Sequence, residues 1–206
     1  PGADRMYPDT DSAPIPLEDS YIKKLSENLP VDIWQRIQQL TTMRIPEDTH
    51  KYILRRNLVP IIEEVSAMGF SARFVGTLLG HNLKCIEGHI PMHKDFSYRR
   101  IVEMFAFLSK QKLHQSISKL MLPVIYQHPN MDFNSVLTSI NFKKRTVDEL
   151  TAPVDYLIEK FKEIRVTKDN NPSIVVNWVM GQLNRQALGN ADLKELRKRI
   201  EERVNS

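Results

Sequence analysis

Residues 171–204 read NPSIVVNWVMGQLNRQALGNADLKELRKRIEERV, and their pattern decides the fold class. Apolar residues recur at spacings of three and four in the first half, at Val176, Val179, Leu183 and Ala187. The second half repeats the spacing at Leu193, Leu196, Ile200 and Val204. Such spacing is typical of one face of an α-helix. Between the halves, Gly189 can adopt the left-handed conformation that ends a helix, and Asn190 can cap the next one. The stretch therefore predicts a helical hairpin with an apolar inner face.

The remainder of the chain follows the same helical pattern. No stretch alternates between apolar and polar residues for long enough to predict a strand. Thr146-Val147-Asp148-Glu149 is a capping box that opens an amphipathic helix reaching Ile164. We therefore predict an all-α protein, with a larger multi-helix domain at residues 17–145 and a small three-helix tail domain at 146–206. Residues 1–16 carry four prolines, which disfavour a helix, and are predicted to be a linker.

Composition sets the broad class. With 206 residues and 41% hydrophobic content, the chain can bury one good core or two modest ones. Its single cysteine, Cys85, rules out an internal disulfide and suits a reducing compartment. No apolar run approaches the roughly 20 residues of a membrane span, so no membrane partner is expected. Gly76 and Gly80 have the spacing of close helix packing. The net charge of +4 permits a polyanionic partner without requiring one.

One group of residues has the side chains of a metal site. His81, Cys85, His89 and His93 follow one another at spacings of four, and these ligand types suit zinc. However, Gly88 and Pro91 are expected to interrupt any helix that would align them, so we favour a packed thiol with surface imidazoles. A metal-dependent enzyme is the alternative. Phosphate loops, nucleophile elbows and dinucleotide-binding fingerprints are all missing from the sequence. We therefore predict neither catalytic residues nor metal ligands in this chain.

Basic residues cluster toward the C-terminal end. They are Lys143, Lys144 and Arg145 before the tail, and Arg185, Lys194, Arg197, Lys198, Arg199 and Arg203 within it. Such a surface binds phosphate backbones without reading bases. An equally good interpretation is a solvated surface with ion pairs within one helix, Glu195 with Arg199 and Arg197 with Glu201. A non-enzymatic helical scaffold, docking a protein through apolar grooves of residues 20–90, is also compatible with the pattern.

Several motifs, in their order along the chain, resemble the GatB/GatE family of tRNA-binding amidotransferase subunits. The segments are Arg5-Met6-Tyr7-Pro8-Asp9-Thr10-Asp11, Leu79-Gly80-His81-Asn82-Leu83-Lys84, Ile117-Ser118-Lys119 to Leu137, and Met180-Gly181-Gln182-Leu183 followed by Ala187-Leu188-Gly189-Asn190-Ala191-Asp192. The first segment looks more like the E-type subunit than the B-type. The last resembles the final two helices of a YqeY-like tail domain.

This resemblance implies a specific function. Residues 1–16 would end a catalytic cradle domain that precedes this chain, and 146–206 would be the YqeY-like tail. The full subunit would use ATP and Mg²⁺ to activate the glutamate on Glu-tRNA(Gln). Ammonia from a glutaminase/asparaginase-like amidotransferase subunit would then give Gln-tRNA(Gln). The chain itself would be the cytoplasmic, tRNA(Gln)-binding portion of this carbon–nitrogen ligase, without a cofactor of its own. The expected tRNA-binding residues are Lys143, Lys144, Arg145, Arg185, Asn190, Lys194, Arg197 and Lys198.

Overall fold

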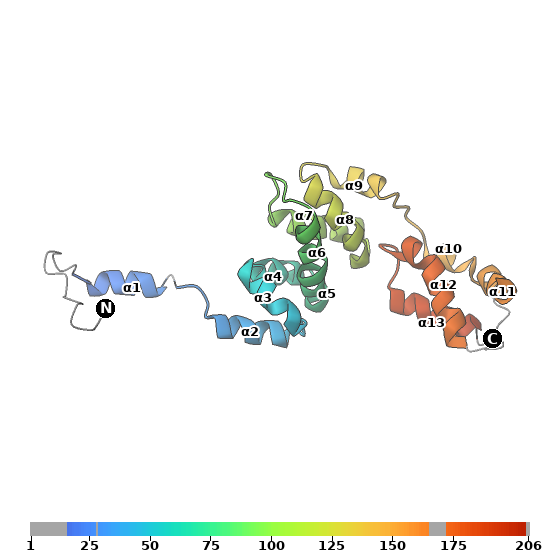
Figure 1. Cartoon of the computed structure of the whole chain (residues 1–206), viewed down its shortest axis with the longest axis horizontal. Helices are drawn as coiled ribbons and strands as arrows, with labels where there is room; N and C mark the ends of the chain where they lie inside the picture. Colours follow the sequence, from blue (N-terminus) through green and yellow to red (C-terminus); the bar gives the residue numbers. More distant parts are fainter. Residues whose placement is uncertain (1–15, 28, 165–171, 205–206) are drawn as a thin grey trace, which may run out of the picture.

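The structure, a computed structural model, describes residues 16–27, 29–164 and 172–204 (Figure 1). Helices, turns and loops account for all of this part of the chain, and it contains no strand. The predicted all-α fold is therefore confirmed. Apart from Pro16, the predicted linker at 1–16 lies outside the described residues, and with it the motif at Arg5–Asp11.

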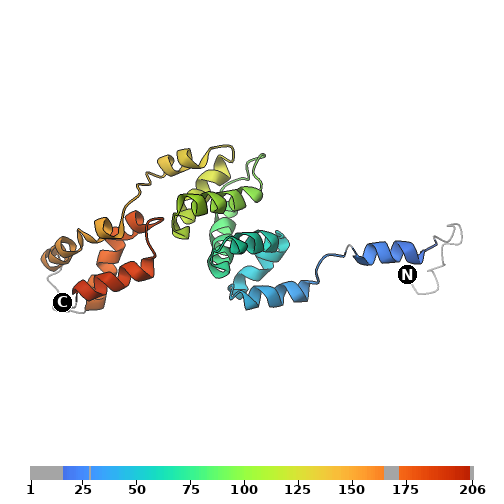
Figure 2. The same cartoon turned by 180° about the vertical axis from the view of Figure 1, so that it is seen from behind.

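The first helix, α1 (Asp19–Glu27), buries none of its residues and extends away from the others (Figures 1 and 2). The following helices pack into one body: α2 (Ile33–Thr42), α3 (Glu47–Arg55), α4 (Val59–Ala67), α5 (Ala72–Thr77), α6 (Lys84–His89), α7 (Arg99–Gln111), α8 (Ser118–Gln127) and α9 (Phe133–Ser139). Side chains without solvent exposure, such as Leu40, Phe105 and Met121, form its core. We refer to this body, residues 33–142, as the helical domain.

Close packing at the centre of the helical domain depends on two glycines. A π-helical turn, Leu78–Leu83, joins α5 to α6, so that one continuous rod passes across α3. A Cβ placed on Gly76 would lie 2.7 Å from Cδ1 of Ile45, and one on Gly80 would overlap Cβ of Thr49. Thr49 is itself buried and donates a hydrogen bond to the Pro46 carbonyl. The predicted small-residue contact is therefore confirmed.

A nearly buried carboxylate fastens α6 to its neighbours. The Glu87 side chain is 7% exposed, and its Oε2 lies 2.8 Å from Nη2 of Arg56. The Tyr98 hydroxyl donates a hydrogen bond of 2.7 Å to Oε1 of Glu87. Burial beside this carboxylate raises the pKa of Tyr98 and of Tyr52 above the ordinary tyrosine value. Both phenols stay protonated well above neutral pH, and the Tyr98 hydroxyl holds Glu87 in place through its hydrogen bond.

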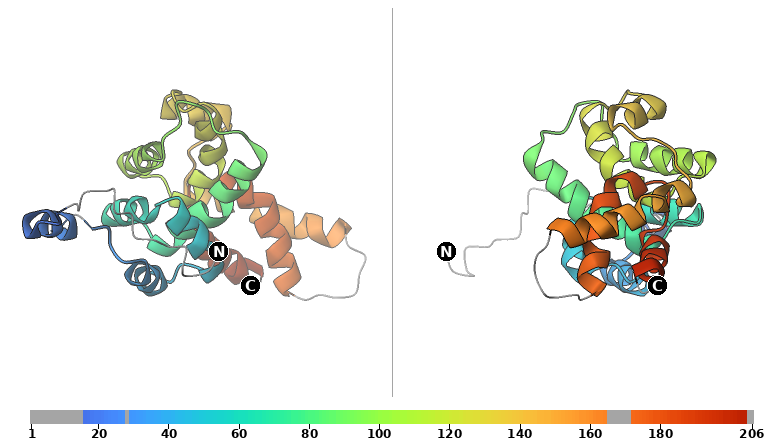
Figure 3. Two further views of the ribbon diagram at one scale, coloured as in Figure 1. Left: turned by 60° about the vertical axis from the view of Figure 1, so that its left-hand side comes forward. Right: turned by 90° about the vertical axis from the view of Figure 1, so that its right-hand side faces the viewer.

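The tail has a separate core. Its helices are α10 (Val147–Thr151), α11 (Val154–Ile164), α12 (Pro172–Ala187) and α13 (Leu193–Val204), with α12 and α13 side by side (Figure 3). Leu150, Leu183, Leu196 and Ile200 are buried together between them. These four residues belong to the predicted domain 146–206, although the boundaries at 16 and 145 stay predictions.

Two predictions for the tail can be compared with the structure, and only the first is confirmed. The capping box is confirmed, since the Thr146 and Glu149 side chains each accept a hydrogen bond from the other's backbone N–H. The helix that it opens was expected to continue to Ile164, but it ends at Thr151 and restarts at Val154. Pro153 lies in this break, because proline has no N–H to donate and its ring crowds the preceding turn.

None of the helices in the described part of the chain has the length and apolar character of a membrane-spanning segment.

Substitution of Gly80 tests the close approach of the π-helical turn to α3. We expect Gly80→Ala to lower the free energy of unfolding by about 1–3 kcal/mol, because Thr49 is buried and has no room to move. Gly88→Ala, in α6, is the matched control, since its Cβ would meet no atom within 4 Å. It should leave stability unchanged or raise it by up to about 1 kcal/mol. Urea unfolding followed by circular dichroism measures both; equal effects would contradict the packing argument.

Candidate nucleic-acid interface

The loop between α12 and α13 docks against the helical domain. Gly189, with a φ of +84°, ends α12 as predicted. Its carbonyl accepts a hydrogen bond of 2.8 Å from the His114 N–H, and its N–H donates one of 3.0 Å to Oγ of Ser116. A Cβ on Gly189 would lie 2.8 Å from Cβ of Ile117 and 2.9 Å from Cε2 of Phe142. Only a residue without a side chain fits this junction.

Asn190 holds the connector between the two bodies. Its Oδ1 accepts a hydrogen bond of 3.0 Å from the Arg145 N–H, and its Nδ2 donates to the carbonyls of Lys143 and Gln186, both at 2.9 Å. The expectation that Asn190 caps α13 is wrong. Asp192 does so, accepting from the Lys194 N–H at 2.7 Å. Both N–H groups of the Asn190 amide are thus used within the chain, and its predicted contact with tRNA stays a prediction.

His114 adds a titratable group to the junction. Its Nδ1 lies 2.9 Å from Oγ of Ser116, and its Nε2 lies 3.9 Å from Oδ2 of Asp192. Burial lowers the pKa of His114 below its ordinary value, and the Asp192 carboxylate offsets part of this effect. The imidazole is therefore neutral at pH 7. The junction is held by neutral hydrogen bonds rather than by an ion pair.

Three of the predicted basic residues meet at a cavity beside this junction. Lys143 and Arg145 come from the connector and Arg185 from α12, and all three line a space of about 240 Å³. Its apolar wall includes Leu120, Ile140 and Phe142, each partly buried. No carboxylate belongs to a described residue that lines this space. We call it the junction pocket.

The basic residues of α13 divide into two kinds. Arg197 binds Oε1 of Glu201 at 2.8 Å and Oδ1 of Asn177 at 3.0 Å, and Arg199 lies 3.1 Å from Oε1 of Glu195. These predicted intrahelical pairs are present. Lys194 and Lys198 are exposed, and neither makes an ion pair with another described residue. The same holds for Lys143, Arg145 and Arg185 at the junction pocket, whereas Nζ of Lys144 lies 3.5 Å from the Gln111 carbonyl.

The four candidate zinc ligands do not gather. His81 lies 3.4 Å from Oδ2 of Asp48, and His93 lies 3.8 Å from Oδ2 of Asp95. Cys85 and His89 share one face of α6, with the sulfur 3.8 Å from Nδ1. Gly88 does not break α6 as expected; the helix runs to His89 and the chain leaves it before Pro91. Among the described residues, no three metal-ligating side chains lie close enough together to hold an ion.

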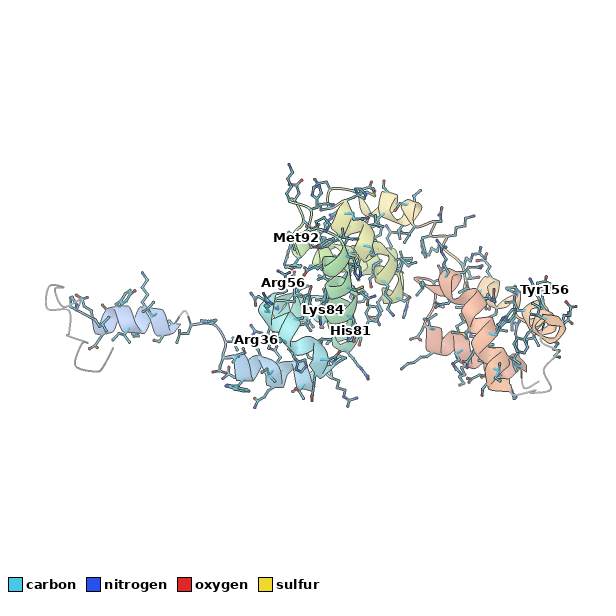
Figure 4. All side chains as sticks on the ribbon, viewed as in Figure 1. Arg36, Arg56, His81, Lys84, Met92 and Tyr156 are labelled. Carbon is cyan, nitrogen blue, oxygen red and sulfur yellow. The ribbon has the colours of Figure 1, made fainter. Side chains whose placement is uncertain are left out.

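A second surface lies at the opposite end of the molecule, within residues 20–90, where the scaffold alternative places its apolar grooves. Tyr21 and Leu25 of α1 are 55% and 50% exposed, and Trp34 of α2 is 71% exposed. The spacing of Trp34 predicts a core position, but no described element covers it. The labelled Tyr156 is also exposed, on α11 in the tail (Figure 4).

Comparison with known proteins agrees with these features. The model of one protein family, described as the GatB domain, matches residues 70–204. The chain belongs to the GatB domain family. The match runs across both cores, from the glycine contact of α5 through the junction to the end of α13. The resemblance expected from the motifs is therefore confirmed.

Curated relatives of this GatB domain chain are named as the E-type subunit of glutamyl-tRNA(Gln) amidotransferase. The chain is 25% identical to the protein of Pyrococcus horikoshii over 80% of its own length and 26% of the relative's. It is 24% identical to that of Methanococcus vannielii over 99% of its own length and 33% of the relative's. The chain thus spans between a quarter and a third of these relatives. Their names agree with the expected E-type rather than B-type likeness. No solved structure matches the chain significantly.

Substitution of Gly189 tests the docking of the tail. Gly189→Ala should destabilise the chain by about 1–2 kcal/mol through its positive φ, and by about 1–3 kcal/mol more through contact with Ile117 and Phe142. Gly69→Ala is the matched control, because Gly69 also has a positive φ but no atom near its missing Cβ. Urea unfolding measures the loss of stability in each variant. In the Gly189→Ala variant, hydrogen exchange should be faster at the backbone N–H of residue 189. Equal losses in both variants would mean that the contacts at the junction contribute nothing.

Proposed function

We propose that the chain is the tRNA-binding portion of a glutamyl-tRNA(Gln) amidotransferase subunit, whose full complex converts Glu-tRNA(Gln) to Gln-tRNA(Gln). Membership of the GatB domain family supports the amidotransferase assignment. The observation that carries the tRNA assignment is the set of cations left without ion pairs among the described residues: Lys143, Arg145, Arg185, Lys194 and Lys198. Their charges are therefore available to an anionic partner, unlike those of Arg197 and Arg199.

The fixed positions of these cations suit contacts with the phosphate groups of an RNA. The unpaired cations are fixed on helices or on a connector held by Asn190, so they can meet a backbone of fixed shape. Folded RNA is recognised largely through its shape and its phosphate and 2′-hydroxyl groups. Such binding positions the RNA and carries little sequence information. In this proposal the chain grips tRNA(Gln), while chemistry takes place on other parts of the complex.

In this proposal the ATP and Mg²⁺ implied for the full subunit bind outside the described residues. Mg²⁺ prefers carboxylate oxygens held near one another and substrate phosphates. No group of three or more carboxylate, imidazole or thiol side chains gathers in this part of the chain. We assign no catalytic step to these residues, and in this proposal the glutamate is activated elsewhere in the full subunit.

A second function is favoured by the exposed apolar surface of α1 and α2. Tyr21, Leu25 and Trp34 are at least half exposed, and beside α2 lies a shallow, mainly apolar space of about 540 Å³ lined by Ile37 and Leu54. Exposed apolar side chains beside an apolar groove are candidate contacts for a protein partner. In this alternative the chain is a helical scaffold that docks the glutaminase/asparaginase-like amidotransferase subunit. The two functions use opposite ends of the molecule and are separable.

Charge variants test the binding of tRNA. Lys143→Gln, Lys194→Gln and Lys198→Gln together should weaken tRNA(Gln) binding by about tenfold or more, and reduce the slope of log affinity against log salt by about 2–3. Fluorescence anisotropy at several salt concentrations measures both. The control replaces three exposed cations elsewhere, Lys23, Lys51 and Arg55, by Gln. Circular dichroism should show unchanged helicity in both. Equal weakening by the two sets would refute the assignment.

Apolar variants test the docking of a protein subunit. Leu25→Ser and Trp34→Ser together should abolish capture of the glutaminase/asparaginase-like subunit after RNA digestion, because both side chains are exposed and apolar. They should leave tRNA affinity within about twofold of the parent. The charge variant above serves as the control that keeps the apolar surface. Capture that survives the double substitution would exclude α1 and α2 as the docking surface.

A further inference from the structure

The junction pocket offers more kinds of contact than binding to a phosphate backbone requires. A flat basic surface is sufficient for backbone contacts, as in the exposed pair Lys194 and Lys198 on α13. The junction pocket instead combines cations with a recess. Lys143, Arg145 and Arg185 stand around a space of about 240 Å³, with the apolar side chains of Leu120, Ile140 and Phe142 in its wall. A recess of this kind accepts a group with an anionic end and an apolar face.

The size and lining of the pocket narrow the choice of ligand. Pockets for drug-sized ligands span roughly 300–1,000 Å³, so this one holds a smaller group. Its lining also includes the amide side chains of Asn141 and Gln186, which can both donate and accept hydrogen bonds. Aromatic rings stack on unpaired bases, and Phe142 supplies one in the wall of the pocket. A single nucleotide has the matching parts: a flat base, polar base edges and a phosphate.

Hydrogen bonds at the junction hold the two walls of the pocket in a fixed arrangement. Asn190 fixes the connector backbone at Lys143 and Arg145, and it binds the carbonyl of Gln186 on the other wall. Phe142 packs against the Gly189 backbone. The two walls belong to different bodies, but the same hydrogen bonds that dock the tail join them. Pre-organised sites of this kind bind without first ordering their side chains and backbone.

We propose that the junction pocket binds one unpaired nucleotide extruded from a folded RNA, with the base against Phe142 and the phosphate between Lys143, Arg145 and Arg185. This inference rests on the proposed tRNA-binding function and adds a local feature of the RNA that the chain recognises. The exposed cations of α13 then supply affinity for any RNA helix. The pocket supplies a preference for RNA that presents an unpaired nucleotide at the right place.

Two RNA probes test the proposal on the full 206-residue chain. One is a duplex with a single bulged nucleotide, and the other is the same duplex fully paired. We expect the chain to bind the bulged duplex about tenfold more tightly, which is the scale of one base-stacking contact. Arg145→Gln with Arg185→Gln should reduce this ratio to below about threefold. The matched control, Lys194→Gln with Lys198→Gln, should weaken both probes equally and leave the ratio unchanged.

A photo-crosslink locates the nucleotide directly. With 4-thiouridine at the bulge, crosslinked peptides should map to residues 140–145 or to 185–186, and the Arg145→Gln, Arg185→Gln variant should lose them. A wild-type ratio near one, or a ratio that survives this double substitution, would overturn the proposal while leaving tRNA binding intact. Absence of any RNA binding by the wild-type chain would overturn the proposed function and this inference together. A crosslink confined to α13 would place the bulge outside the pocket.

Discussion

The two hydrogen bonds of the Gly189 peptide, one from the His114 N–H and one to Ser116, decide where the tail lies. They form because Gly189 has no Cβ, which would otherwise meet Ile117 and Phe142. Asn190 continues the same contact onto the connector at Lys143 and Arg145. The junction pocket exists only because this docking brings residues of α8, the connector and α12 to one place. Burial also keeps His114 neutral, so the joint depends little on salt, unlike the proposed contacts with RNA.

The basic residues of the tail are of two kinds, those paired with carboxylates and those without an ion pair to a described residue. Arg197, Arg199 and Arg203 each lie near a carboxylate, and exposed pairs of this kind contribute little to stability. The main effect of these ion pairs is to neutralise part of the positive charge on α13. Lys194 and Lys198 keep their full charge on its outer face. The tail thus presents unpaired cations on a chain whose net charge is only +4.

Sequence predicted the features that depend on local spacing, and missed those that depend on tertiary contact. The apolar stripes of α12 and α13, the capping box at Thr146 and the helix end at Gly189 follow from residues a few positions apart. The choice of Asp192 over Asn190 as the cap does not, because Asn190 is drawn to the connector 45 and 47 residues earlier. Phe142 and Gln186 gave no signal as site residues, since neither is basic and only docking brings them together. Trp34 has a core-like spacing, and the described chain provides nothing to cover it.

Mechanically, the tail is a lever fixed at one end. The joint at Gly189 follows the last turn of α12, whose 16 residues make a rod of about 24 Å. A tilt of about 10° at the joint would move the far end of this rod by about 4 Å. Arg185 lies about one turn from the joint and would move by about 1 Å. Positional accuracy is therefore greatest at the junction and decreases along the helices. A ligand contact that needs exact positioning would therefore be held most accurately at the junction, and least accurately at the far ends of α12 and α13.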